Sequence, residues 1–493
     1  MFKFTPKLNQ ETKLIIENKE QLREIADCHG SPCNILFPNV MDKNISEFKE
    51  TLKKHNIAGK IFYAHKCNKS NSFIKQALFN NINIDVASLE ELKSALLNGF
   101  TGDKIEATGP KNDDFIILGL RHNIIFNVDS LQEIEKINFY KEKTKNKNKV
   151  KILLRLNGFK SEETKIINKN SRFGTPKSQV NNLISFVQEH NKNLEIIGLS
   201  FHLDTVNMKE KVLAIENCIE IFEEMYEKGL NPYVLDIGGG FKVNYIENKE
   251  EWNQSITELK ESISSGKNNL TWNNTSFGLR SEKGVLKGVL NIYNYYDEIV
   301  GNKLLDEILS SKLSRFQNRK IGEILSENMI ELYIEPGRSL LDGAGINIAK
   351  VNFVKETENH DYLVGLDMKR SDLLIGEQEM FVDPILISNS KIENKGQGIF
   401  FIGNLCMEND IIFKRRIFID KIPESGDLVV FANTAGYFMD FEQSHTIKQK
   451  IATKIIATFE KEKIKFYMDE NYDPLKCSKE TNYEKSIEKW EFF

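Results

Sequence analysis

The sequence predicts an α/β protein in which a closed (β/α)8 barrel is followed by a mainly-β domain. Three observations predict this fold. Short apolar, β-branched runs recur as far as residue 334, and a helix-like stretch follows most of them. After Arg338 the pattern changes to short strand-like pieces interrupted by turns. The 493 residues are enough for both parts, since a domain typically holds roughly 100–200 residues.

Eight runs have the length and composition of buried strands. They are 60–64, 82–86, 105–108, 124–128, 151–156, 195–201, 233–237 and 331–334. Eight strands that alternate with helices are typical of a closed barrel with helices on its outside. The stretch between Phe241 and Glu335 is far longer than one crossover needs, so we expect a helical insertion there.

Two helix starts can be predicted residue by residue. The segments Ser88-Leu-Glu-Glu91 and Ser130-Leu-Gln-Glu133 both have the S-x-x-E capping-box pattern. In this motif the Ser oxygen and the Glu carboxylate accept the backbone N–H groups that the first turn leaves unpaired. The pattern predicts helices that begin directly after residues 88 and 130.

The second part of the chain predicts strands at 362–365, 398–402, 411–418 and 428–432. The segment Glu424-Ser-Gly-Asp427 is typical of a turn that leads into the last of these strands. The charged stretch after Phe459 is compatible with a strand at a sheet edge, a helix or a partly ordered tail.

Composition excludes several classes of protein. Lys plus Arg is 67 and Asp plus Glu is 71, which gives a formal net charge of −4 and no reason to expect nucleic acid as a partner. No apolar run reaches the roughly 20 residues that span a bilayer, and residues 1–13 lack an apolar leader, so we expect a cytoplasmic protein without a membrane partner. The six cysteines include no CxxC pair, and HExxH is absent, so we expect no metal site.

Polar, charged or glycine residues follow all eight predicted strands. They are Lys66, Asp85, Gly109, Asp129, Arg155, His202, the triplet Gly238–Gly240, and Glu335 with Arg338. The carboxyl ends of the strands of such a barrel meet at one end, where active sites of this fold lie. The sequence therefore predicts one polar site at that end.

The residue types at this end are compatible with a phosphorylated cofactor. Gly238–Gly240 can expose backbone N–H groups to a phosphate, or form only a tight turn. Arg338 can bind the same phosphate through its fork of donors. Lys66 is either a solvated side chain or an amine that forms a Schiff base. His202 is either a buried, hydrogen-bonded histidine or a ring that stacks on a planar ligand.

Six motifs then point to a known family. YAHKCN (63–68), SFHLDT (200–205), LDIGGGF (235–241), EPGR (335–338), GNLCMEND (403–410) and NTAGY (433–437) occur in this order. In order and spacing they resemble the fold type III pyridoxal phosphate decarboxylases, which include the diaminopimelate and ornithine decarboxylases and are related in fold to alanine racemase. The resemblance covers about residues 35–440. It implies bound pyridoxal 5′-phosphate, an amino-acid substrate and a homodimer with shared active sites.

The resemblance also implies domain boundaries. Residues 1–36 would form an N-terminal segment that joins the β domain. Residues 37–345 would form the cofactor-binding (β/α)8 barrel, with an insertion at about 242–330. Residues 346–493 would form the C-terminal β domain with its charged tail.

Catalytic roles follow from the resemblance for four residues. Lys66 is similar to the lysine that forms the covalent link to the cofactor, and His202 to the histidine that stacks on the cofactor ring. Glu335 resembles the carboxylate that pairs with the ring nitrogen, and Cys406 the cysteine that the partner subunit contributes.

Further positions resemble the cofactor-binding residues of the family. The phosphate would be bound by Thr205, Gly238, Gly239, Gly240, Gly337, Arg338 and Tyr437. Asp85 and Arg155 would form a polar pair behind the covalent link.

The resemblance implies α-decarboxylation of an amino acid. A carboxylate such as Glu335 keeps the ring nitrogen protonated and strengthens the cofactor as an electron acceptor. Racemases with the same cofactor typically have an arginine there, so Glu335 favours decarboxylation over the alternative of an amino-acid racemase or epimerase. A non-catalytic homologue that binds a partner protein is an alternative of another class.

Three departures from the family pattern bear on the substrate. Met407 follows the interface cysteine where the family usually has an acid that binds a distal ammonium, although Glu408 or Asp410 can substitute. The family's Arg-Pro segment has no clear match, and its nearest stretch is 381–384. The segment after Tyr437 also differs. With Met407, Glu408 and Tyr437 as the substrate-binding residues, we expect an atypical substrate, such as a larger amino acid that carries an extra acyl or carboxyl group.

Overall fold

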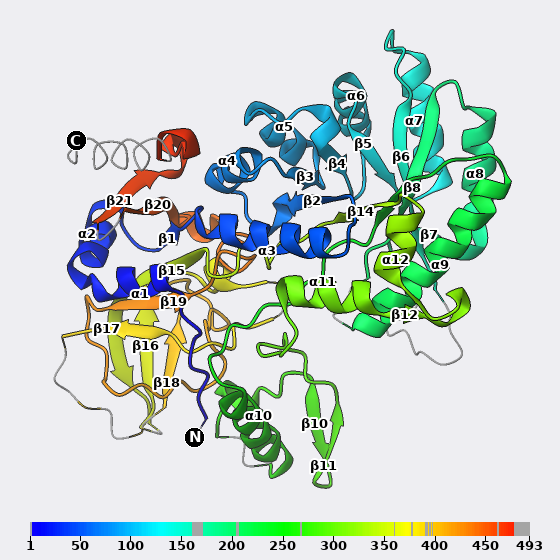
Figure 1. The fold of residues 1–493 in the computed structure, drawn as a ribbon. Coiled ribbons are helices and arrows are strands. Elements are labelled where there is room, and N and C mark those ends of the chain that lie inside the picture. The colour runs from blue at the N-terminus through cyan, green and yellow to red at the C-terminus, as the bar shows by residue number, and fades with distance from the viewer. Residues whose placement is uncertain are drawn as a thin grey trace, which may run out of the picture. The chain divides into compact units, whose positions relative to one another are not determined.

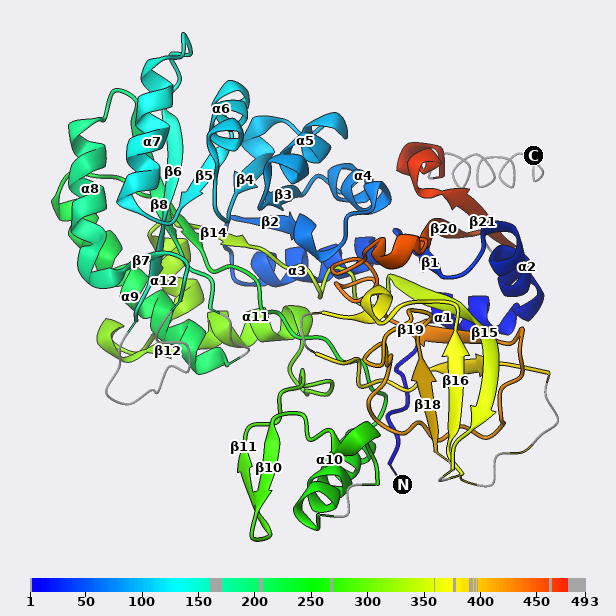
Figure 2. The same ribbon diagram turned by 180° about the vertical axis from the view of Figure 1, so that it is seen from behind.

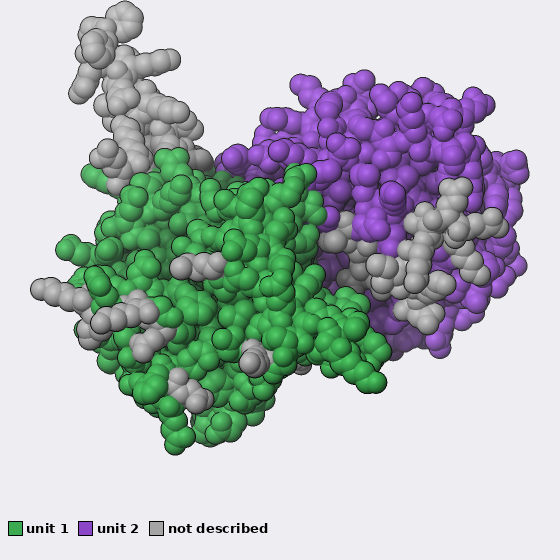
Figure 3. All heavy atoms as spheres, turned by 90° about the horizontal axis from the view of Figure 1, so that it is seen from below, with its two compact units in different colours: residues 1–40, 243–298, 341–493 green, residues 41–242, 299–340 purple. Residues whose placement is uncertain are grey.

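The computed structural model describes residues 2–159, 171–203, 207–266, 269–358, 360–375, 378–389, 393, 396, 398–460 and 463–477. The chain divides into two compact units, shown in green and purple in Figure 3. Unit 1 consists of Met1–Val40, Val243–Glu298 and Leu341–Phe493. Unit 2 consists of Met41–Lys242 and Ile299–Leu340.

Unit 2 is a closed parallel barrel. Its strands, in order around the barrel, are β5 (Ile125–Val128), β4 (Ile105–Ala107), β3 (Asn83–Val86), β2 (Gly59–Ala64), β14 (Glu331–Ile334), β9 (Val234–Asp236), β8 (Leu194–Ser200) and β6 (Val150–Asn157). Pairing of β5 with β6 closes the barrel, and the two-residue β7 (Thr175–Pro176) adds to β6. All eight predicted barrel strands are confirmed, each within one residue at either end.

Helices surround these strands (Figure 1). They are α3 (Val40–Lys54), α4 (Asn71–Phe79), α5 (Leu89–Leu97), α6 (Asp113–His122), α7 (Leu131–Glu142), α8 (Val180–Glu189), α9 (Met208–Glu227), α11 (Gly301–Ser310) and α12 (Ile321–Glu327). The barrel predicted from the alternation of strands and helices is therefore the observed fold.

The two predicted capping boxes are present. The hydroxyl oxygen of Ser88 accepts the N–H of Glu91, and that of Ser130 accepts the N–H of Glu133, each at 3.2 Å. Each glutamate in turn accepts the N–H of the residue before its serine, so its partner lies one position earlier than in the standard motif. These caps start α5 and α7 immediately after β3 and β5.

Apolar side chains fill the barrel. The buried interior cluster consists of Phe62, Ile125, Leu153, Ile197, Val234 and Tyr333. The rings of Phe62 and Tyr333 lie 4.9 Å apart between their centres. Because a barrel of eight strands has room only for its own side chains, a ligand has to bind at one end of the strands.

Unit 1 contains an eight-stranded sheet (Figure 2). Its main order is β17 (Ile385–Ile387), β19 (Leu428–Ala432), β15 (Gly345–Glu356), β1 (Cys33–Leu36), β20 (Thr453–Glu460) and β21 (Lys463–Met468). Strand β16 (Tyr362–Leu366) joins β15 to β18 (Ile399–Ile402). Helices α1 (Gln10–Glu17) and α2 (Lys19–His29) precede β1. The mainly-β part of the prediction is confirmed.

The structure settles two details of this unit. The segment 411–418 is not a strand: among the described residues it forms isolated bridges, from Ile402 to Ile411, from Ile399 to Ile417 and from Thr271 to Arg415. The side chains of Phe413 and Arg415 within it are buried. The charged stretch after Phe459 continues β20 and then forms the edge strand β21.

The long stretch between Phe241 and Glu335 is divided between the units. The sequence predicts an insertion into the barrel at about 242–330, but residues 243–298 belong to unit 1, and α11 and α12 belong to the barrel. The unit 1 part holds α10 (Lys249–Ser264) and the hairpin of β10 (Leu279–Glu282) and β11 (Val285–Gly288). Trp252 and Tyr295 fix it there, because they pack in one core with Phe4 and Phe381.

Among the residues that the structure describes, we find no helix of the length and apolarity that a membrane span requires.

Candidate active site

The predicted site residues of unit 2 lie at the carboxyl ends of the barrel strands. Lys66 lies in the 3₁₀ turn His65–Cys67 that follows β2, Asp85 lies in β3, and Arg155 lies in β6. His202 follows β8, and Glu335 directly follows β14. The barrel thus brings together side chains that lie far apart in the sequence, as the prediction requires.

Glu335 is the anionic centre of this end of the barrel. Its carboxylate is 5% exposed, and Oε2 lies 3.4 Å from Nδ1 of His202. Burial alone raises the pKa of the Glu335 carboxyl. The hydrogen bond with His202 and the positive charges of Lys66 and Arg155 outweigh burial and lower this pKa to about 2. Glu335 is therefore ionised throughout the neutral pH range.

His202 has two partners at one nitrogen. The N–H of Gly239 points at Nδ1 from 3.3 Å, and the Glu335 carboxylate approaches the same atom. With its proton on Nδ1 the ring donates to Glu335, and with its proton on Nε2 it accepts from Gly239. Burial lowers the pKa of His202, so the neutral ring is favoured. The two contacts hold the ring over the glycine turn.

Asp85 is a buried acid beside the lysine. The hydroxyl of Thr108 donates to its Oδ1, whereas its Oδ2 is buried without a hydrogen-bond partner among the described residues. Burial and the Glu335 charge raise the pKa of Asp85 to about 7, against the opposing effect of Lys66. Asp85 therefore exchanges a proton near neutral pH.

Arg155 is oriented by residues outside the predicted pair with Asp85. Its Nη1 lies 3.8 Å from Oδ1 of Asp129, and its guanidinium stacks over the ring of Phe173 at 4.7 Å. The same Asp129 oxygen accepts the N–H of Gly174. Arg155 thus presents a cation at the end of β6, within electrostatic reach of Glu335.

The glycine turn that follows β9 has no room for side chains at its first two positions. Gly238 has a φ of +64°, and a Cβ there would lie 2.6 Å from Nδ1 of His202. A Cβ on Gly239 would lie 2.7 Å from the carbonyl oxygen of Glu335. The N–H of Gly238 donates to Oδ1 of Asp236 at 2.9 Å. The first two glycines are therefore needed for close packing against His202 and Glu335. Among the residues that the structure describes, the N–H of Gly240 has no hydrogen-bond partner and is available to a ligand.

Glu335 has two acidic neighbours that sequence reasoning missed. One carboxylate oxygen each of Glu106, Asp236 and Glu335 lie within 4.8 Å of one another. Burial and mutual repulsion raise the pKa values of Glu106 and Asp236 well above their usual range. The Asn127 amide donates to Glu106 at 2.7 Å and accepts from the Ser200 hydroxyl at 2.6 Å. The three acids could ligate a cation, and the raised pKa values of Glu106 and Asp236 favour the sharing of protons within the cluster.

A signal for these neighbours exists in the sequence. Glu106 and Asp236 each stand inside a short strand that is otherwise apolar, where a charged residue is costly unless it is paired. An acid in the middle of β4 and another at the last position of β9 indicate a buried polar cluster, whereas a polar residue after a strand indicates only where the strand ends.

The segment after Glu335 continues the site. The N–H of Leu340 donates to the carbonyl of Gly337, which makes a tight turn that contains Arg338. Arg338 is partly buried. The hydroxyl of Ser339 is buried and has no hydrogen-bond partner among the described residues.

The remaining predicted residues lie in unit 1. Cys406, Met407 and Glu408 form the exposed tip of a loop after β18. Asp410 closes this loop: its carboxylate accepts the N–H groups of Leu405 and Arg370, both at 2.8 Å. Asp410 is 5% exposed and both its oxygens accept backbone N–H groups, so the carboxylate is used within the loop rather than presented to a substrate.

Tyr437 is held in a strained backbone conformation. Its φ is +74°, which is rare for a bulky residue, and its side chain is partly exposed. The N–H groups of Asp440 and Phe441 donate to its carbonyl at 3.1 Å and 2.9 Å. Strain of this kind clusters at functional positions, which agrees with a ligand-binding role for this tyrosine. Thr205 lies outside the described residues.

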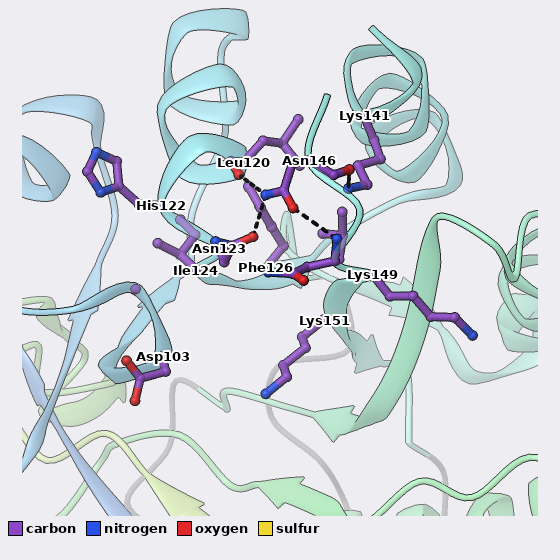
Figure 4. Close-up of a pocket in the computed structure, with 13 residues that line it drawn as sticks. Asp103, Leu120, His122, Asn123, Ile124, Phe126, Lys141, Asn146, Lys149 and Lys151 are labelled. Carbon is purple, nitrogen blue, oxygen red and sulfur yellow. Dashed lines mark hydrogen bonds between the residues drawn. The ribbon is translucent and has the colours of Figure 1, made fainter. Parts of the chain in front are cut away.

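A pocket of about 330 Å³ lies at the opposite end of the barrel (Figure 4). Ile124 and Val150, at the starts of β5 and β6, are among its lining residues. The Asn146 amide bridges the carbonyl oxygens of Leu120 and the Asn123 side chain, at 3.4 Å and 2.5 Å. Because residues at this end of such barrels typically serve stability, the pocket is separate from the candidate active site.

Comparisons with known proteins agree with this geometry. Residues 40–284 match the family model described as "Pyridoxal-dependent decarboxylase, pyridoxal binding domain". The chain is 27% identical over 418 residues to the uncharacterized protein y4yA of Sinorhizobium fredii, with 84% of each chain covered. It is 24% identical over 458 residues to the diaminopimelate decarboxylase of Staphylococcus aureus, covering 90% of this chain and 93% of the relative.

A solved structure has the same fold. The diaminopimelate decarboxylase of M. jannaschii, in co-complex with L-lysine, superposes with a TM-score of 0.68 at 19% identity. The match covers 90% of this chain and 91% of that one.

Proposed function

We propose, from the premise that this chain belongs to the fold type III pyridoxal phosphate-dependent decarboxylase family, that it catalyses the α-decarboxylation of an amino acid. The observation that carries the proposal is the ionised Glu335 beside His202 at the carboxyl end of the barrel. When bound, pyridoxal phosphate would supply an acceptor for the electrons that remain on Cα after carbon dioxide leaves.

The residues of unit 2 fit this cofactor. Gly238 and Gly239 form a cradle that a Cβ would fill. The N–H of Gly240 has no partner within the described part of the chain and would be available to a phosphate oxygen. The hydroxyl of Ser339, the residue after Arg338 in the sequence, is buried without a hydrogen-bond partner among the described residues. Donors gathered after β9 and β14 are the chemistry that binds a phosphate dianion.

Each side chain of the site then has a separate task. Lys66 supplies the amine that binds the cofactor covalently, and Asp85 and Arg155 tune the charge near that amine. Glu335 keeps a proton on the ring nitrogen, since an anion with a pKa of about 2 favours a cation beside it. His202, which is oriented by the N–H of Gly239, would stack on the ring of the bound cofactor.

The residues of unit 1 complete the proposal. Cys406 at the exposed loop tip is the proton donor to Cα, and it acts in the partner subunit of a homodimer with shared sites. Tyr437 binds the phosphate, and its strained backbone supports a role of that kind. Thr205 keeps its predicted role as a phosphate ligand.

The substrate is proposed to be an atypical amino acid. Met407 is 50% exposed at the loop tip and cannot pair with an ammonium. Asp410 is occupied by backbone N–H groups, so Glu408 is the acid of this loop that is left to contact a substrate. These features support a larger substrate with an extra acyl or carboxyl group over a simple diamino acid. The cytoplasmic location expected from the sequence stays a prediction.

One experiment tests the proposal. Purified protein loaded with pyridoxal phosphate is screened against amino acids, including N-acylated and citrate-conjugated diamino acids, for release of carbon dioxide. We expect release from at least one of them. Lys66→Ala should abolish it, together with the adduct trapped by borohydride and the visible absorbance of the bound cofactor. Lys69→Ala, three residues along in the same segment, is the matched control and should keep all three signals.

The racemase alternative makes a different prediction. If the protein binds the cofactor through Lys66 but only exchanges the Cα proton of amino acids in heavy water, decarboxylation is wrong. If no adduct can be trapped at Lys66 at all, the non-catalytic homologue is favoured.

A further inference from the structure

Lys211 is a buried lysine for which the proposed reaction has no task. It lies in the first turn of α9, and its side chain is 0% exposed. Its Nζ donates to the carbonyl of Gly239 at 2.6 Å and to that of Ile237 at 3.3 Å. A fully buried lysine is rare unless its charge is paired. The partners here are two carbonyls of the turn that is assigned to the phosphate.

We propose that Lys211 is a positioning residue for the phosphate group of the cofactor. It holds the glycine turn from behind, and it adds a buried positive charge beneath the phosphate. This inference rests on the cofactor of the proposed function, but not on the reaction that the cofactor performs.

The hydrogen bonds of the turn explain why such a residue is needed. The carbonyl of Gly238 accepts the N–H of Glu335 at 3.1 Å, and the carbonyl of Gly239 accepts the Lys211 ammonium. The N–H groups of these two glycines point to Asp236 and His202. Among the described residues the N–H of Gly240 has no partner. Lys211 thus holds the peptide that connects Gly239 to Gly240, whose N–H end faces the phosphate.

The electrostatics support the same role. Burial lowers the pKa of Lys211 to about 8, against the charges of Asp236 and Glu335, which favour the cation. The ammonium also lies 5.7 Å from the ring centre of Phe241. Burial of Lys211 is costly, because a charge inside a protein has lost its water. A phosphate dianion on the other side of the turn offsets that cost, since charges attract more strongly in a medium of low polarity.

The test compares the binding of pyridoxal phosphate with that of pyridoxal, which lacks the phosphate. Dissociation constants are measured for the wild type, Lys211→Met, Lys211→Arg and the control Lys209→Met, which removes an exposed lysine two residues earlier on the same helix. We expect Lys211→Met to weaken the binding of pyridoxal phosphate by about 10- to 100-fold, the loss typical of a charge-assisted hydrogen bond. The binding of pyridoxal should weaken by less than about 3-fold in the same variant, since pyridoxal has no phosphate for Lys211 to attract. Lys211→Arg should restore most of the preference for the phosphorylated form.

Lys211→Gln keeps a donor for the Gly239 carbonyl without the charge, and it replaces Lys211→Met if the latter does not fold. It should still lose most of the preference for pyridoxal phosphate over pyridoxal. Equal weakening of both ligands by Lys211→Gln or Lys211→Met would overturn the inference and assign Lys211 a purely structural role. Unchanged affinity for both ligands in these variants would overturn the inference as well. If the Lys211 variants lose affinity for pyridoxal phosphate as expected, but the wild type releases no carbon dioxide, the proposed reaction is refuted and this inference stands.

Discussion

Nδ1 of His202 lies 3.4 Å from Oε2 of Glu335. The contact connects the residue proposed to cover the cofactor ring with the residue proposed to set the charge of the ring nitrogen. The same imidazole nitrogen accepts from the N–H of Gly239 when its own proton is absent, so the histidine, the carboxylate and the glycine turn form one connected hydrogen-bond system.

Glu335→Gln keeps the size of this side chain but removes its charge. Without the anion the ring nitrogen is no longer held protonated, and turnover of the substrate found in the screen should fall about 100-fold or more, within the range typical of a lost acid–base contribution. Cofactor binding should change by less than about 10-fold, because the phosphate contacts remain. Glu331→Gln, at the other end of the same strand, is the control. An unchanged turnover number in Glu335→Gln would remove Glu335 from the chemistry.

Gly238→Ala should impair cofactor binding for a steric reason. The new Cβ would lie 2.6 Å from Nδ1 of His202 and 2.9 Å from the carbonyl of Phe201. Gly229→Ala is a matched control, because Gly229 has a φ of +73° and no atom within 4 Å of its Cβ position. Both variants should lose about 1 kcal/mol from the left-handed backbone conformation.

Only Gly238→Ala should then lose affinity for pyridoxal phosphate, by at least about 10-fold, a factor that corresponds to 1.4 kcal/mol. Equilibrium dialysis and thermal unfolding of both variants separate the two effects. Equal cofactor affinity in the two variants would refute the close packing of the turn against His202.

The raised pKa of Asp85 predicts how the free energy of unfolding of the cofactor-free protein depends on pH. Its pKa is about 7 in the folded chain and about 4 when exposed, so the folded state binds the extra proton between these values. The free energy of unfolding should therefore fall as the pH rises from about 4 to about 7. Asp85→Asn should reduce this slope by up to about 1.4 kcal/mol per pH unit.

Urea unfolding at several pH values measures the slope. Asp114→Asn, which removes an exposed carboxyl of the same unit, is the control and should leave the slope unchanged. A slope that is identical in Asp85→Asn and in the wild type would show that Asp85 keeps an ordinary pKa in the folded chain.

Arg415 makes unit 1 sensitive to a single substitution. Its Nη1 lies 2.6 Å from Oδ1 of Asp383, and its guanidinium lies over the rings of Phe4, Phe381 and Phe413 at 4.8 to 5.4 Å. Arg415→Met leaves the buried Asp383 charge unpaired, so it should cost about 3–5 kcal/mol of stability.

Arg280→Met removes an arginine that is 70% exposed and paired with Glu282, and it should cost less than about 1 kcal/mol. Chemical unfolding of both variants measures the difference. Equal losses would mean that the Arg415 pair is not shielded from water.

The shared-site homodimer is tested by mixing two inactive variants. Lys66→Ala lacks the covalent link and Cys406→Ala lacks the proton donor. If each site takes Lys66 from one subunit and Cys406 from the other, the mixed dimer has one intact site, and random exchange restores up to about a quarter of wild-type activity. Each variant exchanged with itself is the control. No recovery under conditions where subunit exchange is demonstrated would mean that each site takes both residues from one subunit.

The barrel could be predicted because its signal is local. Each strand is a short apolar run, and each capping box lies within four residues, so no knowledge of distant contacts is needed. The polar residues after the strands could be predicted for the same reason. The partners of the glycine N–H groups could not be predicted in this way, because the N–H groups of Gly238 and Gly239 point to Asp236 and His202 only once the barrel has formed.

Other features depend on contacts that a sequence pattern does not contain. Lys211 stands in an ordinary charged helix start, and only the fold brings it beneath Gly239. The acid at position 410 is suited to a substrate by type, but two backbone N–H groups use it. The segment 411–418 has the composition of a strand, yet Arg415 within it is buried against aromatic rings.

The composition of unit 1 has a consequence for biosynthesis. Strand β1 lies between β15 and β20, and both of these come from the last part of the chain. On the ribosome, every strand of the barrel is made before β15, whereas β1 leaves the exit tunnel long before its partners β15 and β20 exist. The barrel can therefore fold first, while β1 presents two unpaired edges, which are prone to associate with other chains. Nascent chains that stop before β20 should accordingly depend on chaperones more than full-length chains do.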